Sequence, residues 1–111
     1  MEIREETCPS ATILAPNGRL DSNASSEFGT HTSRVIAAGV RALVIDFTAV
    51  AYISSTGLRV LLQAAKSLKT GGKKIVLCGL CENVMTVFDA SGFTSLFEIY
   101  DSQNAALAAV S

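Results

Sequence analysis

Short apolar segments alternate with amphipathic segments along most of this chain, and this alternation restricts the folds that it can adopt. Residues 42–48 and 74–78 are rich in branched apolar side chains, as expected of strands buried in a sheet. Between them, residues 56–70 repeat leucine and alanine at helical spacing and carry charged side chains mostly on the opposite face. Strands separated by helices favour a largely parallel sheet with right-handed crossovers.

The segments before and after this unit extend the same order. Two strands precede the first helix with no helix between them, which predicts an antiparallel N-terminal edge. Pro16-Asn17-Gly18 is expected to form a turn after the second strand. The fold class is therefore α/β, with a mostly parallel sheet of about four to five strands covered by about four helices. The expected strands are 2–6, 11–16, 42–48, 74–78 and 97–100, and the expected helices are about 24–38, 56–70, 83–90 and 103–109.

The composition fits one folded domain over residues 1–111. The chain has 49% apolar and 17% charged residues, which favours a packed core over disorder. Its net charge of −1 is spread along the chain without a basic run, so nucleic-acid binding is not expected. The uncharged stretch 47–58 is too short to span a bilayer, and the acidic N-terminus lacks the pattern of a signal peptide. We therefore expect a cytoplasmic protein without membrane insertion.

Three neighbouring hydroxyl groups lie at the start of the second expected helix. They belong to Ser54, Ser55 and Thr56, and no acid or base stands beside them in sequence. Ser54 or Ser55 can cap this helix, and serine is favoured at N-caps for that reason alone. A hydroxyl group held between a strand and a helix is also exposed and fixed in place, which suits covalent modification. Because parallel strands end at one edge of a sheet, the loop 80–83 and Asp21 are expected near this cluster.

An enzymatic function is not expected. A serine at a strand-to-helix turn resembles a hydrolase nucleophile, but the glycine two residues before it is missing, since Ile53 precedes Ser55 at that distance. The single histidine, His31, lies within an expected helix, and we expect a surface or hydrogen-bonded side chain. Gly71-Gly72-Lys73 ends a helix and precedes a strand, so it does not form a phosphate-binding loop.

A C-x-x-C motif, Cys78-Gly79-Leu80-Cys81, stands between an expected strand and an expected helix. Redox dithiols have this placement. In thioredoxin-like folds, a cis-proline later in the chain faces the dithiol. Both prolines of this chain precede the motif, so no proline could take that position. Cys8 and His31 are the other candidate zinc ligands, and they form no second ligand pair. We therefore expect Cys78 in the core and Cys81 near a helix cap, with no metal and no cofactor.

Four short motifs follow one another along the chain. They are Gly18-Arg19-Leu20-Asp21, Val44-Ile45-Asp46-Phe47, Tyr52-Ile53-Ser54-Ser55-Thr56-Gly57-Leu58 and Ala90-Ser91-Gly92-Phe93. In this order they resemble the motifs of the STAS domain, the fold of bacterial anti-sigma factor antagonists. The resemblance covers nearly the whole chain and implies one STAS domain over residues 1–111. Asp21 and Asp46 match acidic positions of the family, and both also suit a role as a cap or loop anchor.

The resemblance implies a mechanism of partner switching. In the family, the unmodified domain binds an anti-sigma factor or serine kinase with an ATP-binding fold, and phosphorylation of a serine dissociates the complex. A metal-dependent serine phosphatase reverses the modification. Carried over by position, the phosphoacceptor is Ser55, with Ser54 and Thr56 as alternatives. The common pattern has an aspartate where this chain has Ser54, so a negative charge beside the acceptor is lost.

The resemblance also implies a partner-binding surface around the start of this helix. Two of the residues expected to contact the partner, Arg59 and Gln63, are equally consistent with ordinary solvent-facing positions. The expected function is an anti-sigma factor antagonist that regulates transcription through protein–protein contacts. The alternatives are a scaffold subunit of a signalling complex and a docking subunit of a lipid-transport ATPase, both without sigma-factor control. The expected partner-binding residues are Asp21, Ser54, Thr56, Gly57, Leu58, Arg59 and Gln63.

Overall fold

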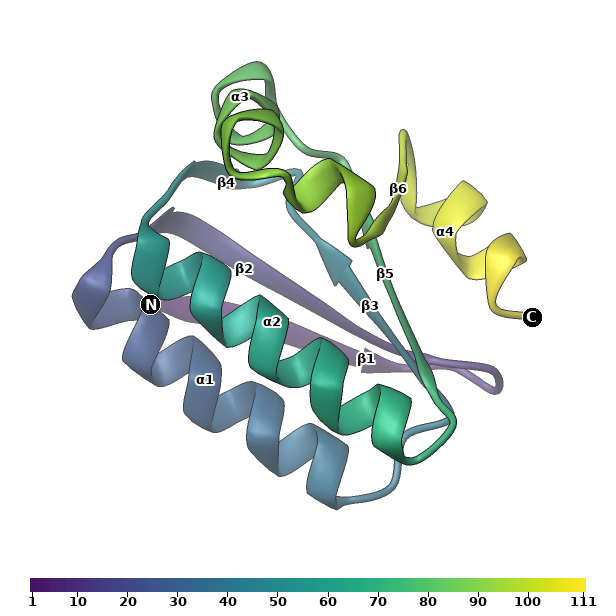
Figure 1. Cartoon of the computed structure of the whole chain (residues 1–111). Coiled ribbons are helices and arrows are strands. Elements are labelled where there is room, and N and C mark those ends of the chain that lie inside the picture. Colours follow the sequence, from purple (N-terminus) through teal and green to yellow (C-terminus); the bar gives the residue numbers. More distant parts are fainter.

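A six-stranded sheet organises the fold in the computed structural model, which describes residues 1–111 (Figure 1). Its strands are β1 (Glu2–Thr7), β2 (Thr12–Leu20), β3 (Ala42–Asp46), β4 (Val50–Ile53), β5 (Lys74–Cys78) and β6 (Glu98–Tyr100). Five of them follow the order β1-β2-β3-β5-β6, and β4 pairs with β2. The β1–β2 pair is antiparallel and all other pairs are parallel. The expected α/β class, parallel sheet and antiparallel edge are thus confirmed.

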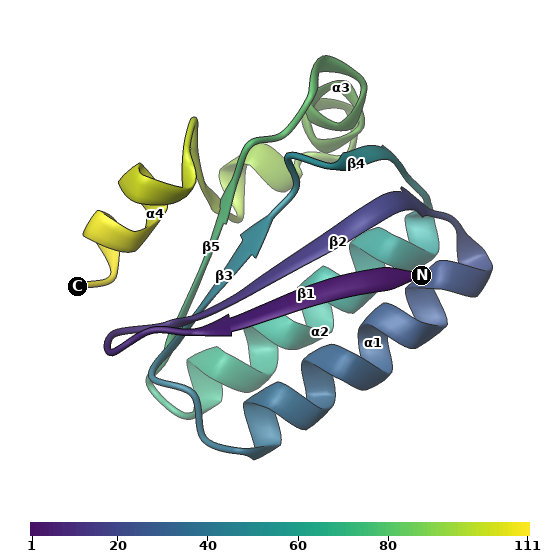
Figure 2. The same cartoon turned by 180° about the vertical axis from the view of Figure 1, so that it is seen from behind.

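Helices cover the sheet on both faces and at one end. They are α1 (Ser22–Ala37), α2 (Ser55–Thr70), α3 (Glu82–Ser91) and α4 (Gln103–Ala109), with a short 3-10 helix at Phe93–Ser95. Helices α1 and α2 lie side by side on one face, and α4 lies on the other (Figures 1 and 2). Helix α3 lies over β4, near the carboxyl ends of the parallel strands (Figure 1). The predicted helix ends differ from these by no more than two residues.

The expected turn at Pro16-Asn17-Gly18 is wrong, because β2 continues through these residues. On one side β1 stays paired along this stretch, with Ile3 opposite Pro16. On the other side β2 pairs with β3 only up to Leu14 and with β4 only from Gly18. Pro16 therefore lies where the parallel partner changes, a position that tolerates the missing N–H of proline.

Strand β4 was not among the expected elements, because its apolar pattern does not alternate. Val50 and Ile53 at its ends are buried, while Ala51 and Tyr52 between them are exposed. A β-bulge explains this spacing: one step along β2, from Gly18 to the next residue, corresponds to two steps along β4, which makes Ala51 the additional residue. The buried positions are therefore three residues apart, and the period of two that identifies a strand is lost.

Two apolar layers lie on the two faces of the sheet. The larger layer, under α1 and α2, contains 16 buried residues, among them Leu14, Phe28 and Leu61. The smaller layer, under α4, contains 7 buried residues. At the end near α3, Phe88 packs edge-to-face on Phe47 with ring centroids 6.2 Å apart, which holds this helix against the sheet. Seen from behind, β1 and β2 have no helix in front of them (Figure 2).

The two cysteines of the C-x-x-C motif occupy structural positions, as expected. Cys78 is fully buried at the end of β5, and burial, followed by the nearby carboxylate of Asp46, raises the pKa of its thiol to about 12. Cys81 is the N-cap residue of α3, and its thiol donates to a backbone carbonyl of β4 at 3.5 Å. His31 is hydrogen-bonded, as expected, with Nε2 at 2.8 Å from Oε1 of Glu5.

Gly57, in the first turn of α2, marks a very close approach between this helix, β2 and α1. A Cβ atom at this position would lie 2.8 Å from Cγ1 of Ile53 and 3.2 Å from Oγ of Ser25. It would also lie 3.3 Å from the backbone oxygen of Leu20, which cannot easily move aside. The absence of a side chain at Gly57 therefore lets the start of α2 pack directly on the ends of β2 and β4.

We expect Gly57→Ala to destabilise the fold by roughly 1–3 kcal/mol, because the added methyl group overpacks this contact. Gly29→Ala is the matched control, since Gly29 also lies within a helix but a Cβ there would only touch Val60 at 3.4 Å. The control should be neutral, or more stable by up to ~1 kcal/mol through helix propensity. Urea unfolding followed by circular dichroism measures both changes. Equal stability of the two variants would contradict this role of Gly57.

Candidate functional site

Two helices begin next to each other at the carboxyl ends of β2 and β4. Leu20 and Ile53, the last residues of these strands, are opposite each other in the parallel pair. The N–H of Ser54 donates to the carbonyl oxygen of Leu20 at 2.8 Å, which ties the two helix starts together. Asp21 caps α1 and Ser54 caps α2, each by accepting a backbone N–H three residues later. The expected proximity of Asp21 to the hydroxyl cluster is confirmed.

We refer to Asp21, Ser54, Ser55 and Thr56 as the rim, and its three hydroxyl groups have different environments. The Oγ of Ser54 accepts from the N–H of Gly57 at 3.2 Å, so this hydroxyl group is used in capping. Ser55, the first residue of α2, is exposed and takes no part in the cap. Thr56 is half-buried. Ser55 therefore presents the most accessible of the three hydroxyl groups.

Gly57 and Leu58 lie beneath the rim. Both are buried, and only 7% of the surface of Leu58 is exposed. Ser25 supports the same region from α1, with its hydroxyl group donating to the carbonyl oxygen of Leu20 at 3.4 Å. Their burial leaves little surface for direct contact, and partner binding by Gly57 and Leu58 stays a prediction.

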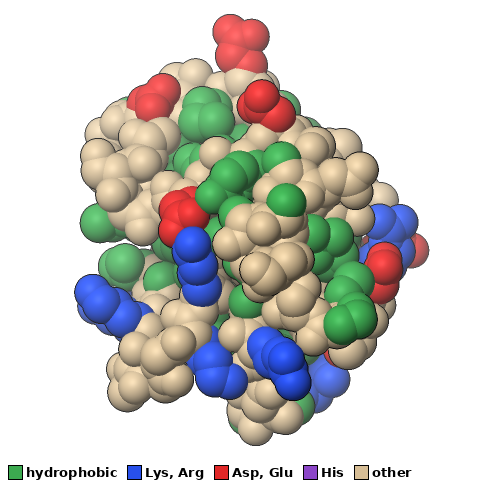
Figure 3. Space-filling model, turned by 90° about the vertical axis from the view of Figure 1, so that its right-hand side faces the viewer, with side chains coloured by type: hydrophobic (Ala, Val, Ile, Leu, Met, Phe, Trp, Pro, Cys, Tyr) green, Lys and Arg blue, Asp and Glu red, His purple; other side chains and the backbone are tan.

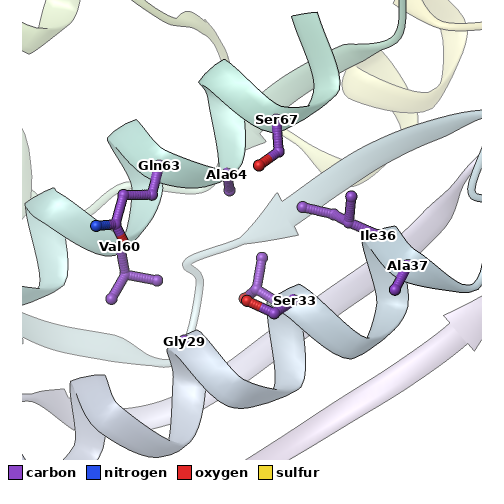
Figure 4. Close-up of a pocket in the computed structure, with 9 residues that line it drawn as sticks. Gly29, Ser33, Ile36, Ala37, Val60, Gln63, Ala64 and Ser67 are labelled. Atoms are coloured by element: carbon purple, nitrogen blue, oxygen red, sulfur yellow. The ribbon is translucent and has the colours of Figure 1, made fainter. Parts of the chain in front are cut away.

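Arg59 and Gln63 lie on the exposed side of α2. Gln63 lines a groove of about 280 Å³ between α2 and α1, together with Val60 of its own helix (Figure 4). Gly29 and Ser33 of α1 line the opposite side of the groove (Figure 4). Arg59 and Gln63 thus extend the accessible surface from the rim along α2.

The start of α2 carries little charge of its own. This helix has no acidic residue in its first turn, so no side chain of that turn compensates the positive end of its dipole. Asp21 supplies the carboxylate of the rim. Basic side chains gather at the other end of α2 and at the start of β5, in the lower part of the face shown in Figure 3. These bases include Lys66, Lys69, Lys73 and Lys74.

The structure adds two residues beside the rim that sequence reasoning did not select, Arg19 and Tyr52. They are opposite each other in the β2–β4 pair, and Cζ of Arg19 lies 4.4 Å from the centre of the Tyr52 ring. This is a cation–π contact. The bulge creates it, because without the additional residue Arg19 would be opposite Ala51. A bulge is defined by pairing between strands far apart in sequence, so no local signal predicts this pair.

Asp46 anchors the loop that leads from β3 to β4. Its Oδ1 accepts from the N–H of Thr48 at 2.9 Å and from the hydroxyl group of the same residue. Its Oδ2 accepts from Nε2 of Gln103 in α4 at 3.0 Å. Both oxygens of this carboxylate are thus used within the fold, and the interpretation of Asp46 as a loop anchor is confirmed.

Metal-binding groups and membrane-spanning segments were not found. No group of three or more His, Cys, Asp and Glu side chains lies close enough together to hold a metal ion. None of the helices combines the length and the apolar character needed to cross a bilayer. What the rim does offer is a free hydroxyl group at a helix start, next to the capping residues of two helices.

The sequence matches a known family along almost its whole length. The STAS domain model matches residues 2–106. BtrV of Bordetella bronchiseptica, a protein named as an anti-sigma factor antagonist, is 34% identical over 109 residues, which cover 98% of this chain and 94% of BtrV. The anti-sigma-B factor antagonist of Listeria monocytogenes is 40% identical over 57 residues, which cover 51% of this chain and 50% of that protein.

Solved structures share the fold. A Thermotoga maritima protein described as an anti-sigma factor antagonist has a TM-score of 0.92 at 22% identity, over 97% of this chain and 93% of that chain. The anti-sigma factor antagonist SpoIIAA in its unphosphorylated form has a TM-score of 0.85 at 19% identity, over 98% of this chain and 96% of SpoIIAA. The chain therefore belongs to the STAS domain family, among relatives named as anti-sigma factor antagonists.

Proposed function

We propose that this chain is an anti-sigma factor antagonist that works by partner switching at Ser55. In its unmodified form it binds an anti-sigma factor that is also a serine kinase with an ATP-binding fold. Phosphorylation of Ser55 dissociates this complex, and a metal-dependent serine phosphatase restores the unmodified form. The observation that supports the proposal most strongly is the exposed hydroxyl group of Ser55, which is not used in capping α2.

The names of similar proteins support the class of partner. BtrV, which matches 98% of this chain, is named as an anti-sigma factor antagonist, and such a name implies an anti-sigma factor as its partner. SpoIIAA, which shares the fold, has been solved in an unphosphorylated and in a phosphorylated form. A protein with this fold can therefore carry a phosphate group and remain folded.

The capping role of Ser54 favours Ser55 over Ser54 as the phosphoacceptor. Serine and aspartate are about equally favourable at an N-cap, so Ser54 supplies the cap that an aspartate would supply, without its charge. A phosphate group on Ser54 would disturb the hydrogen bond to the N–H of Gly57. Thr56 is half-buried and less accessible to a kinase. The proposed partner surface consists of the rim with Arg59 and Gln63, and Gly57 and Leu58 support it from beneath.

The added charge explains how the partner would be released. A phosphate group carries about −1.5 to −2 charge at neutral pH. The start of α2 tolerates this charge, because the free N–H groups and the helix dipole favour an anion there. In a docked interface the same charge must lose water or face acidic groups, which costs several kcal/mol. A penalty of about 3–4 kcal/mol weakens binding on the order of 10²- to 10³-fold.

We expect the ATP-fold serine kinase that is the proposed partner, supplied with ATP, to add one phosphate group to the wild type and none to Ser55→Ala, because Ser55 is the proposed acceptor. Ser54→Ala is the matched control. It should still be phosphorylated, although loss of the cap lowers its stability by about 0.5–2 kcal/mol. Intact mass and peptide mapping measure the phosphate group. A phosphate group that persists in Ser55→Ala would contradict the assignment, and a stable complex without phosphate would favour the scaffold or transporter function.

A second prediction separates charge from the chemistry of phosphorylation. Ser55→Glu should bind the kinase at least tenfold more weakly than the wild type, since it places about one negative charge at the same position. Thr70→Glu places the same charge at an exposed hydroxyl residue at the far end of α2, outside the groove lined by Gln63, and should bind like the wild type. Calorimetric titration gives both affinities. If the two variants bind equally well, charge at Ser55 does not control the complex.

A further inference from the structure

We propose that Arg19 and Tyr52 form a preorganised anchor for the partner, with Arg19 receiving a carboxylate group and Tyr52 an adjoining apolar surface. This inference rests on the proposed function and deepens it, because it states the chemistry that the partner must present beside Ser55. The anchor lies at the ends of β2 and β4, each residue two positions before an N-cap.

The geometry around the pair indicates a surface role. Leu20 and Ile53 are buried in the layer under α1 and α2, so the residues before them in each strand point to the opposite face of the sheet. Tyr52 is 38% exposed, which makes it one of two large apolar residues exposed on this chain. Packing in the apolar core therefore does not explain why an aromatic residue occupies this position.

The β-bulge supplies an independent observation. A bulge interrupts the regular hydrogen bonding of a strand pair and is rare between parallel strands. Here it places Tyr52 opposite Arg19, where the ring and the guanidinium group stack at 4.4 Å. Stacking restricts both side chains before any partner arrives, and this lowers the entropy that binding would otherwise lose. Tyrosine and arginine are also among the residues enriched at positions that dominate binding energies at interfaces.

The charge of Arg19 points to a carboxylate as its counterpart. The ion pairs within the chain join Met1 to Glu27, Glu5 to His31 and Arg34, and Lys74 to Glu98. Arg19 is in none of them, so its positive charge remains available to another molecule. A planar guanidinium group matches the two oxygens of a carboxylate, while the exposed part of the Tyr52 side chain offers apolar contact beside it.

This arrangement also connects the anchor to the proposed switch. Arg19 precedes Leu20 and Ser55 follows Ser54, and the backbone hydrogen bond from Ser54 to Leu20 at 2.8 Å makes the two positions neighbours. A carboxylate bound to Arg19 would therefore meet a phosphate group on Ser55 as a nearby like charge, which is repulsive. The group that provides affinity in the unmodified complex is the one that phosphorylation would repel.

Calorimetric titration of the proposed partner, the ATP-fold serine kinase, with unphosphorylated variants tests the anchor. We expect Arg19→Glu to weaken binding at least tenfold and Tyr52→Ala about fivefold or more. Arg41→Glu is the matched control, since it reverses an exposed arginine just before β3, at the opposite end of the parallel strands, and should bind like the wild type. The affinity of the wild type should fall more steeply with salt than that of Arg19→Ala, because the latter lacks the charge pair.

The outcomes separate this inference from the function on which it rests. If the wild type binds and Arg19→Glu binds equally well, the anchor is overturned while partner switching stands. If Arg19→Ala and Tyr52→Ala lower the melting temperature but leave the affinity unchanged, the pair only stabilises the β2–β4 contact, and the anchor is again overturned. If the wild type does not bind the kinase at all, the proposed function fails and the anchor fails with it.

Discussion

The pairing of β4 with the end of β2 is the contact on which the candidate site depends. It places Leu20 opposite Ile53, and the hydrogen bond from the N–H of Ser54 to the carbonyl oxygen of Leu20 extends the contact by one residue. Since a helix follows each strand directly, α1 and α2 must begin at the same edge of the sheet. The missing side chain of Gly57 makes this approach sterically feasible, and the Asp46 anchor fixes the loop that enters β4.

Two of the hydroxyl groups at this edge have separate roles that one residue could not combine. Capping needs a side chain that is already engaged with the backbone, whereas modification needs one that is accessible and free. Ser54 performs the first task and leaves Ser55 available for the second. Because an anion at a helix start is stabilised by the helix itself, a phosphate group there would act mainly on a docked partner. The proposed switch therefore requires no rearrangement of the core.

Elements defined by local pattern could be predicted from the sequence, and those defined by pairing could not. The apolar run of β5 and the caps at Asp21, Ser54 and Ser102 all lie where capping residues and periodicity indicated. The turn expected at residues 16–18 is absent because β2 changes its parallel partner in mid-strand, and β4 was missed because its pairing with β2 contains a bulge. The same bulged pairing brings Arg19 to Tyr52, so no local pattern in the sequence could predict this contact.

The central claim is that charge on an unchanged fold releases the partner. A two-dimensional ¹⁵N–¹H NMR spectrum of the fully phosphorylated chain, compared with the unmodified chain, tests it most directly. The account predicts shifts confined to the first turn of α2 and its neighbours around Asp21, in a sample that no longer binds the kinase. Shifts spread through β5, α3 and the buried core would contradict it, because release would then follow from a change of fold.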